Sequence, residues 1–474
     1  MPVNASMSLA KSLPLDDSAP VAEAIPVADA SPVVDASPTV DGSDAARRAV
    51  AVEDRYPTPD EVVRAAELLA ERHPELCRLR QVGRSRAGRP LLLLSVGRAA
   101  PQALVVAGAH ANESVGGATV LELARRVVAD PGLRAGCTWN LLLCLDPDGA
   151  SLASHGRTPG PYTLAGHYRD FFRPAGEEQP EWAPSLGADL PESRALLAVI
   201  DELRPFLQCS LHSTDVGGTF LQATRDQPGL DGHFARSAAG LGIPVELSPY
   251  DVYFWPNPNP GVFLMPEAAD RGPEASSREL GRTTWHAPHR HGGSTLIVEV
   301  PLWTCGRLAD PTPIGDPEAE LTALAARMRR HGRLLDELLA QAERLGALTE
   351  GPLPRAVRSA LDVCAPLADE WDPGVVLPDQ PALPPMTRSR LATLELWAHR
   401  VPLRAASMLR RALDPQRPGT GPLRDRLEAL ADHWCEEYRQ RFPGTWLPIA
   451  RQVEHQAGTV AAAVLLARPG GGAR

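Results

Sequence analysis

The sequence has few of the features that mark nucleic-acid-binding, disulfide-stabilised or membrane-spanning proteins. Lys11 is the only lysine, and 48 basic residues face 58 acidic ones for a net charge of −10, so a broad basic surface for nucleic acid is not expected. The seven cysteines are an odd number without close spacing, which argues for reduced thiols rather than a disulfide framework. The longest late apolar run, residues 460–467, is too short to cross a bilayer, and the amino terminus lacks the apolar stretch of a signal peptide. We therefore expect a cytoplasmic protein that binds neither nucleic acid nor membranes.

The sequence does contain enough apolar residues for a large core. Its 474 residues, 43% of them hydrophobic, allow about three domains. Residues 1–54 repeat Ala, Pro, Ser, Val and Asp without aromatic residues, which predicts a disordered tail. A compact domain is expected over residues 55–346, and a separate helical carboxy-terminal region over residues 347–474.

Apolar runs alternate with helix-like segments in the compact domain, which is typical of layered α/β proteins. The segments predicted as buried strands are residues 91–96, 103–107, 139–145, 206–211 and 295–298. After Pro301 the apolar residues recur at helical spacing, including a face with Leu423, Leu427, Leu430, Trp434 and Tyr438. These helices are expected to pack on one another and on the α/β domain, to cover its crevice, or to mediate homo-oligomerisation.

The most informative motif is His110-Ala111-Asn112-Glu113, directly after the strand predicted at residues 103–107. An imidazole and a carboxylate three residues apart can bind one Zn²⁺, and a third ligand from elsewhere leaves a position open for water. Spacing alone is weak evidence, because His433 and Glu436 repeat it inside an amphipathic helical segment. We interpret that second pair as exposed helical side chains.

Position in the predicted fold separates the two motifs. Open α/β sheets bind ligands outside the carboxyl ends of their strands, and His110, Glu113, His212 and Glu299 all lie at or just after such an end. The sequence therefore predicts that these four side chains meet in one crevice. The alternatives are a hydrogen-bonded histidine at a strand end for His212 and a surface residue on an edge strand for Glu299.

The sequence resembles the zinc metallocarboxypeptidases related to carboxypeptidase A. The resemblance begins at Tyr56-Pro57 and continues through VGRSRAGRPL at residues 82–91, which is similar to the family's G-x-S-x-x-G-R stretch. Further along, the matching motifs are His110-x-x-Glu113, Pro147-Asp148-Gly149, Leu211-His212-Ser213 and TLIVE at residues 295–299. The resemblance implies an α/β fold with a mixed central sheet flanked by helices, followed here by the separate helical region.

The resemblance also implies the roles of the site residues. His110, Glu113 and His212 would bind one Zn²⁺ per chain, and Glu299 would be the general base. A His₂Glu site of this kind polarises its bound water, and a nearby carboxylate can accept that water's proton.

Arginine and tyrosine roles follow from the family less directly. Tyr168-Arg169-Asp170-Phe171 is similar to the family's Asn-Arg-Asn-Phe, so Arg169 is expected to bind the substrate carboxylate. Arg157 is expected to polarise the scissile carbonyl, and Arg173 is the substitute for either arginine. The family's catalytic tyrosine has no counterpart, and Tyr250 and Tyr253 are candidates for a specificity pocket.

Two further positions stay open. The carboxylate that orients a ligand histidine in the family is replaced by Gly166, and Asp215 or Asp146 is the candidate substitute. His286, His289 and His291 are interpreted as parts of a polar loop rather than as a second metal cluster.

The leading functional prediction is a zinc carboxypeptidase acting on peptides. The first alternative is an amidase or deacylase of small N-acyl amino acids, similar to aspartoacylase and succinylglutamate desuccinylase, and this alternative gains if Arg169 is remote from the metal. The second alternative is a catalytically inactive scaffold whose helical region binds a partner.

Overall fold

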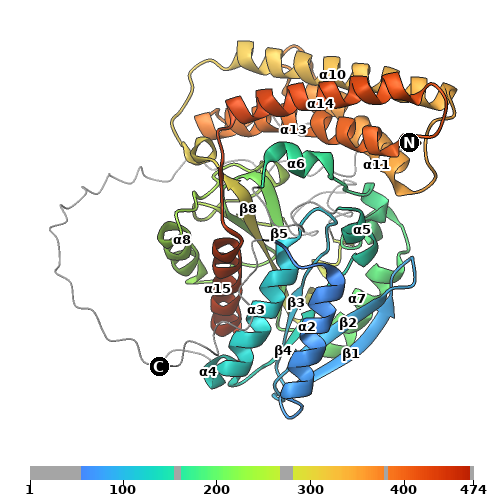
Figure 1. Ribbon diagram of the computed structural model, residues 1–474. Helices are drawn as coiled ribbons and strands as arrows, with labels where there is room; N and C mark the ends of the chain where they lie inside the picture. Colours follow the sequence, from blue (N-terminus) through green and yellow to red (C-terminus); the bar gives the residue numbers. More distant parts are fainter. Residues whose placement is uncertain (1–54, 154–161, 267–280, 378–382, 470–474) are drawn as a thin grey trace, which may run out of the picture.

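A mixed sheet forms the centre of the molecule, seen in a computed structural model that describes residues 55–153, 162–266, 281–377 and 383–469 (Figure 1). Within these ranges the spatial order of the strands is β1 (Cys77–Arg84), β2 (Pro90–Val96), β4 (Thr138–Leu142), β3 (Gln102–Val106), β5 (Leu207–Gly217), β8 (Ser294–Thr304), β6 (Phe220–Ala223) and β7 (Val262–Leu264). The short strand β9 (Thr445–Trp446) pairs with the end of β8. Strands β4, β3, β5 and β8 are parallel neighbours, whereas β1, β2 and β6 join antiparallel. The mixed α/β fold class is therefore confirmed.

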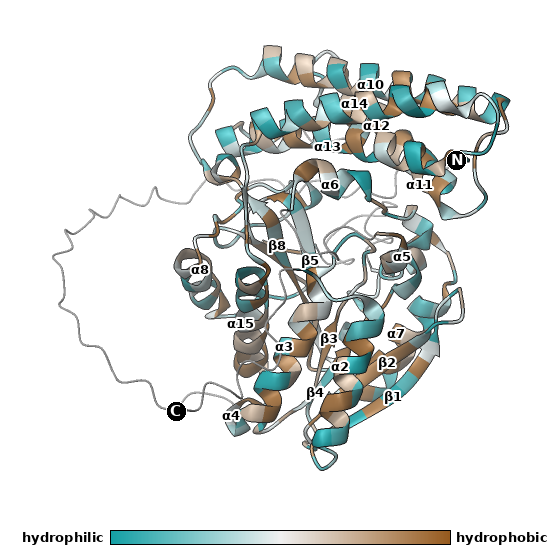
Figure 2. Cartoon of the chain, viewed as in Figure 1, coloured by the Kyte–Doolittle hydropathy of each residue, from teal (hydrophilic) through white to brown (hydrophobic). Residues whose placement is uncertain are grey.

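Helices cover both faces of this sheet, because its central strands are apolar on both sides. In β3, Ala103 and Val105 face one layer, and Leu104 and Val106 face the other, as the period-two geometry of a strand requires. The helices of the first layer are α2 (Pro59–Arg72), α3 (Val115–Ala129), α8 (Leu230–Gly240) and α15 (Ile449–Ala467). On the second face the sheet packs against α7 (Pro191–Leu203). Figure 2 shows the resulting band of hydrophobic residues along the central strands.

The predicted strands are all present, but β5 and β8 are longer than expected. The sequence predicts that they end near residues 211 and 298, whereas they run to Gly217 and Thr304. The two strands pair with each other along almost this whole length, from Leu207–Ser294 to Gly217–Thr304. Pairing with a neighbour thus extends β5 through the polar residues 212–215 and β8 through Pro301, where strand propensity alone would end them.

A bundle of helices lies at one end of the sheet. Its members are α10 (Glu318–Arg344), α11 (Pro352–Asp362), α12 (Cys364–Trp371), α13 (Arg388–Ala412) and α14 (Thr420–Arg441). They share one apolar core, to which α14 contributes the buried residues Leu423, Leu427, Trp434 and Tyr438 of the predicted face. We call these five helices the helical region.

The sequence predicts that a separate helical region begins at residue 347, but the packing of the helices does not follow that boundary. Helix α10, which precedes that position, packs on α12 and α13, whereas α15 returns to pack on α3, α8 and β8. Figure 1 shows α15 beside α3, far from the bundle. The reason is that the buried face of α15 fits the sheet layer, where Val460 and Val464 contact the core.

The helical region is docked on the α/β layers through specific contacts. Helix α13 packs on the 3₁₀ turns at Tyr250–Val252 and Gly306–Ala309, and α14 packs on α6 (Leu164–Arg169). The Arg411 guanidinium donates hydrogen bonds to the carbonyl oxygens of Leu152, Asp170 and Phe171. The bundle therefore lies over the end of the sheet where β5 and β8 terminate. None of the described helices is long and apolar enough to span a membrane.

Candidate metal centre

The sheet leaves a crevice open beside β5. Strand β3 ends at Val106, which pairs with Ser210, while β5 and β8 continue side by side. Beyond Ser210 the β5 residues therefore have no β3 partner on that side. His212 and Glu299 occupy directly opposed positions of β5 and β8 at this point, so they lie within strands and still at the mouth of the crevice.

A tight turn after β3 places His110 and Glu113 against the same crevice. Gly108 has a φ of 62°, and a Cβ atom at this position would lie 2.7 Å from Sγ of Cys144, so glycine suits both the conformation and the close approach. The Glu113 N–H donates a hydrogen bond of 3.2 Å to the His110 carbonyl. Helix α3 begins two residues after Glu113, and its N-terminal dipole favours the carboxylate.

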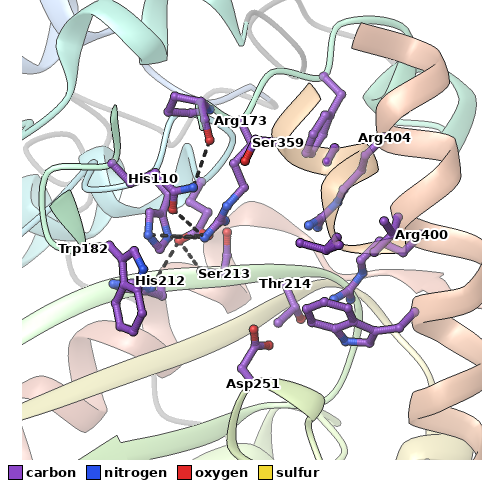
Figure 3. Close-up of a pocket in the computed structure, with 18 of the residues that line it drawn as sticks. His110, Arg173, Trp182, His212, Ser213, Thr214, Asp251, Ser359, Arg400 and Arg404 are labelled. Atoms are coloured by element: carbon purple, nitrogen blue, oxygen red, sulfur yellow. Dashed lines mark hydrogen bonds and ion pairs between the residues drawn. The ribbon is translucent and has the colours of Figure 1, made fainter. Parts of the chain in front are cut away.

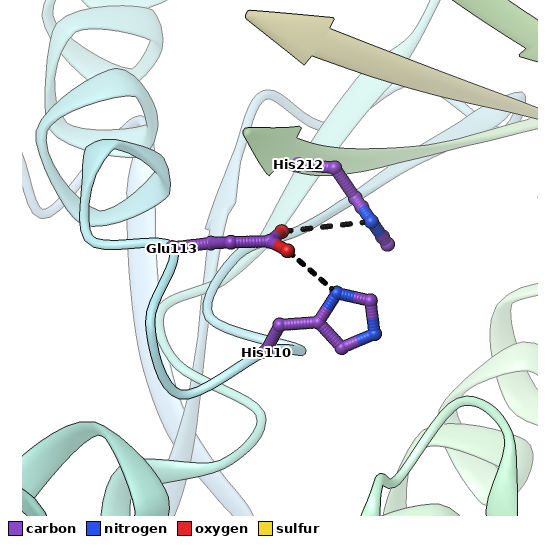
Figure 4. Close-up of side chains that lie close together, drawn as sticks. All are labelled: His110, Glu113 and His212. Carbon is purple, nitrogen blue, oxygen red and sulfur yellow. Dashed lines mark hydrogen bonds and ion pairs between the residues drawn. The ribbon is translucent and has the colours of Figure 1, made fainter. Parts of the chain in front are cut away.

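His110, Glu113 and His212 form a buried cluster (Figure 4). The ligand-type atoms of the three residues all lie within 4.8 Å of one another. Glu113 lies between the rings, with Oε1 2.9 Å from Nδ1 of His110 and Oε2 3.6 Å from Nδ1 of His212. The backbone N–H of Ser213 also donates to Glu113, which fixes the carboxylate against β5. The three predicted ligands therefore meet, from segments about one hundred residues apart.

A buried glutamate that the sequence analysis did not find holds His212. Nε2 of His212 lies 3.0 Å from Glu181, whose other carboxylate oxygen accepts a hydrogen bond from Ser210. An Nε2–H donated to Glu181 leaves Nδ1 as the free lone pair facing Glu113, which is the tautomer that a metal ligand requires. Asp215 and Asp146, the expected candidates, lie elsewhere: Asp215 pairs with Arg400, and Asp146 caps α5 (Pro147–Leu152).

Glu299 stands beside the cluster without being one of its three members. Its Oε1 lies 3.6 Å from Nδ1 of His212, and its Oε2 has no hydrogen-bond partner among the described residues. Burial raises the pKa of Glu299 to about 8, and the negative charge of Glu113 adds to the rise while His212 opposes it. A carboxylate in this setting is poised to accept and return a proton near neutral pH.

The charges of the cluster favour a cation. Burial alone lowers the pKa of His212, but the negative charge of Glu113 and the hydrogen bond to Glu181 raise it to about 9. Burial and the nearby Arg173 lower the pKa of His110 to about 4, so this imidazole is neutral at pH 7. The carboxyl groups of Glu113, Glu181 and Glu299 thus surround the two imidazoles. The nitrogen and oxygen atoms of this group suit Zn²⁺.

Arg173 is the predicted arginine that lies at the cluster. Its Nη1 donates to Oε1 of Glu113 at 2.9 Å, and its Nη2 lies 3.3 Å from the His110 ring and 3.3 Å from the Gln179 side-chain oxygen. Figure 3 shows its guanidinium beside His110 and above Ser213. Arg157, expected to polarise the carbonyl, lies outside the described residues.

The other predicted substrate-binding residues do not line the cavity beside the cluster. Arg169 is exposed at the last residue of α6, where its carbonyl accepts a hydrogen bond from Arg410. Tyr250 is buried against the helical region, with its hydroxyl 2.5 Å from Glu370 and 2.9 Å from Nε1 of Trp371. Tyr253 is buried near Met386. The positions of these residues do not support the expected roles, which stay predictions. For the two tyrosines the reason is that α12 and α13 cover the surface where they lie.

A cavity of about 230 Å³ opens beside the cluster and extends to the helical region. Its walls include four groups that the sequence analysis did not connect with the site: Trp182, Trp285, Asp251 and the pair Arg400 and Arg404. Arg400 and Arg404 lie one helical turn apart on α13, embedded in apolar residues. The burial of these arginines is a property of the structure that no local sequence pattern indicates, and Glu181 lies in an irregular loop that carries no pattern either.

The histidine-rich loop does not form a second metal site among the described residues. His110, Glu113 and His212 are the one group there with metal-ligand geometry. His286 and His289 have ring centroids 5.4 Å apart, while His291 lies 2.7 Å from Asp201. Within the described ranges these three histidines therefore do not share metal-ligand geometry, and His289 and His291 lie in a 3₁₀ turn at Ala287–His291.

Comparisons with known proteins point to one family. Residues 62–217 match the family model described as zinc carboxypeptidase, a range that contains all three cluster residues and ends before Glu299. No curated protein matches the chain.

Several solved structures are similar to the chain at low identity. Carboxypeptidase A from Helicoverpa armigera is 16% identical, with 55% of this chain and 69% of that chain aligned at a TM-score of 0.33. A metallo-carboxypeptidase from Burkholderia cenocepacia is 18% identical over 50% of this chain, with a TM-score of 0.33, and this chain spans only 59% of that protein. Bovine thrombin-activatable fibrinolysis inhibitor, solved in complex with tick carboxypeptidase inhibitor, is 16% identical over 40% of this chain and 71% of its own, with a TM-score of 0.28.

The family match and the buried cluster agree on the same residues. The match covers about a third of the 474 residues, and it leaves the helical region and α15 without a counterpart. Over residues 62–217 the chain is therefore similar to the zinc carboxypeptidase family, and the three residues of the buried cluster lie within that match.

Proposed function

We propose that the protein is a zinc-dependent hydrolase of the carboxypeptidase type, which cleaves an amide bond close to a free carboxylate of its substrate. The observation that carries the proposal is the position of Glu299, at a cavity wall and 3.6 Å from a histidine of the buried His110–Glu113–His212 cluster. A three-residue metal site with a separate carboxylate at its edge is the arrangement expected for metal-assisted hydrolysis.

The donor set fits zinc in both atom type and surroundings. Two imidazole nitrogens and one carboxylate leave a position open, as catalytic zinc sites do. When bound, zinc would supply Lewis-acid polarisation of a carbonyl group and of water. Glu181 supports the site by holding the His212 ring through Nε2.

The surrounding residues have distinct roles in the proposed reaction. Glu299 accepts a proton from the attacking water and returns it to the departing amine, because it lies at the cavity wall beside the cluster. Arg173 directs its N–H groups to the side of the cluster where Glu113 lies, so it can stabilise negative charge that develops on a carbonyl oxygen beside the metal.

A second candidate function is an amidase of small N-acyl amino acids. Two observations favour it: Arg169 is exposed and does not line the cavity, and the cavity volume of about 230 Å³ lies below the roughly 300–1,000 Å³ of sites for drug-sized ligands. A cavity of this size suits a single acyl amino acid or a short peptide end.

The test compares substrates on zinc-reconstituted protein and on protein stripped with a chelator. One panel contains short peptides with free and with amidated carboxyl ends, and another contains N-acetyl amino acids; products are separated by mass spectrometry. Hydrolysis of free-ended peptides that requires zinc supports the carboxypeptidase, and hydrolysis confined to N-acetyl amino acids supports the amidase. Zinc-loaded protein that hydrolyses neither panel would contradict the proposal and favour the inactive scaffold.

A further inference from the structure

The cavity has two walls from distant parts of the chain. One wall carries the His110–Glu113–His212 cluster with Glu299 and Arg173. The other belongs to the helical region, where α11 and α13 contribute Ser359, Trp397, Arg400, Arg404 and Met408. Figure 3 shows Arg400 and Arg404 extending from α13 toward the cavity, on the side opposite His110 and His212. We call these five residues the helical wall.

The two arginines of the helical wall share one carboxylate as their ion-pair partner. Asp215 lies 2.5 Å from Arg400 and 3.4 Å from Arg404, so one carboxylate faces two guanidinium groups. The Tyr168 hydroxyl also donates to Asp215. The arginines keep the pKa of Asp215 well below its usual range although burial acts to raise it, so the carboxylate is charged and already engaged. Asp251 is a further carboxylate that lines the cavity.

The two arginines are engaged to different degrees. Arg400 is buried, forms the shorter ion pair with Asp215, and donates to the Val216 carbonyl at 3.4 Å. Arg404 is less buried, lies over the Phe171 ring at 4.9 Å, and makes only the longer contact with Asp215. Within the described ranges its hydrogen bond runs from Nη2 to Asp215, and its Nε is buried without a partner, as is Nε of Arg400. With 17% of its side chain exposed against 6% for Arg400, Arg404 is the more accessible of the two arginines in the cavity wall.

We propose that Arg404 of the helical region binds the free carboxylate of the substrate, with Arg400 and Asp215 as positioning residues. This inference rests on the proposed function and defines its substrate class as small amides that carry a carboxylate across the cavity from the reacting carbonyl. A planar guanidinium matches a carboxylate in shape and charge, and its position over the Phe171 ring keeps it oriented. The helical region then completes the active site and takes the role expected for Arg169.

Arg173 does not compete for this role. Its N–H groups are directed to Glu113, His110 and Gln179 at the cluster. A carboxylate bound there would lie beside the metal ligands, where the scissile carbonyl has to be placed. The two guanidinium groups on opposite walls therefore serve opposite ends of a short substrate.

The test measures binding without turnover. Glu299→Gln protein is titrated calorimetrically with a panel of N-acetyl amino acids and their carboxamides, which differ only in the charged group. The panel spans aliphatic, aromatic, acidic and basic side chains. Each titration is repeated without zinc, because a carboxylate can also bind the metal directly. The variants are Arg404→Gln, Arg404→Lys and the control Arg410→Gln, a partly exposed arginine on the same helix that donates a hydrogen bond to the Arg169 carbonyl.

The expected result is that at least one acid binds about 10- to 100-fold more tightly than its amide, with and without zinc. Arg404→Gln abolishes this preference, Arg404→Lys retains part of it without the bidentate geometry, and Arg410→Gln leaves it unchanged. Circular dichroism melting checks that each variant is folded. If Arg404→Gln does not fold, Arg404→Lys provides the test instead. The proposal is overturned if Arg404→Lys prefers the acid over the amide as strongly as the parent protein does.

The proposal is also overturned if no acid binds better than its amide, or if the preference survives in Arg404→Gln. These failures are distinct from failure of the proposed function. Hydrolysis with an acid preference that does not depend on Arg404 rejects this carboxylate site and keeps the hydrolase. An Arg404-dependent preference in a zinc-loaded protein that hydrolyses nothing rejects the hydrolase and keeps the site.

Discussion

The chain contains the His-x-x-Glu spacing twice, and the two copies have opposite surroundings. His110 and Glu113 lie in a turn after β3, with 7% and 5% of their side chains exposed, and they face His212 from β5. His433 and Glu436 lie within α14, with 68% and 48% of their side chains exposed. His433 approaches Glu437 at 3.7 Å, while Glu436 pairs with Arg439.

The difference shows that the His-x-x-Glu spacing alone does not make a metal site. A helix places residues three apart on one face, where solvent and neighbouring charges satisfy them. A turn at the open end of a parallel sheet instead brings the pair against side chains from other strands, with little water to compete. A metal site therefore depends on the third ligand and the burial, both of which come from distant segments.

The largest expected effect separates the two copies directly. His110→Ala should reduce bound zinc from about one per chain to nearly none, because two remaining ligands hold the ion weakly. His433→Ala should leave zinc unchanged. Metal analysis by mass spectrometry after dialysis provides the measurement, and equal zinc in both variants would remove the basis for the site.

Replacing the carboxylate beside the cluster should separate catalysis from metal binding. Glu299→Gln is expected to keep zinc but to lower kcat by about 10²–10⁴-fold, the contribution of a general base. The matched control Glu436→Gln should keep full activity. A Glu299→Gln variant that retains the rate of the parent protein would show that another group accepts the proton.

The contact between Glu181 and His212 predicts an intermediate effect on metal affinity. Glu181→Gln should weaken zinc binding about 10- to 100-fold, because the carboxylate fixes the His212 ring and its tautomer. Asp146→Asn is the control, since Asp146 contacts Arg86 and the Gly149 N–H but not the cluster. Competition with a chromophoric chelator measures both affinities, and equal losses would mean that Glu181 has no special role.

The smallest expected effect is on stability, and it comes from Glu246, a buried carboxyl group outside the metal cluster. Burial raises the pKa of Glu246 from 4.5 to about 7, although the Gly218 N–H and Arg400 act to lower it, while Asp251 and Asp215 add to the rise. The folded state therefore holds a proton that the unfolded state loses first, so stability falls as pH rises from about 4.5 through 7. Glu246→Gln should remove this fall, raising the free energy of unfolding at pH 8 by at most about 3 kcal/mol and hardly at pH 4.

Thermal melting of Glu246→Gln and the parent protein at both pH values tests this expectation. The exposed Glu436→Gln should show no gain in Tm at pH 8. A Glu246→Gln variant with the same gain at pH 4 and pH 8 would mean that its effect comes from packing rather than from ionisation.

Several features of the fold follow from local sequence patterns. The strands near residues 91–96 and 103–107 were predictable because apolar runs bounded by Gly and Pro have few other low-energy arrangements. The buried face of α14 follows from its helical spacing. The ends of β5 and β8 were not predictable, because their extra length depends on pairing with each other.

Residues outside recurring motifs were located only by tertiary packing. Tyr250 and Tyr253 look like pocket residues in the sequence, yet the helical region covers them. Arg169 occupies the position of a family motif but lies at the exposed end of a short helix. Glu181 and Arg404 have no recognisable local pattern, and each gains its place from a contact with a residue far along the chain.

The sequence by itself determined which three side chains can bind a metal and which carboxylate accompanies them, because these residues follow strands whose pattern is local. Only the tertiary structure decided which carboxylate orients His212 and that α13 forms the opposite wall of the cavity. These choices depend on how helices dock on a sheet, and docking is set by the shapes of whole surfaces rather than by the order of neighbouring residues.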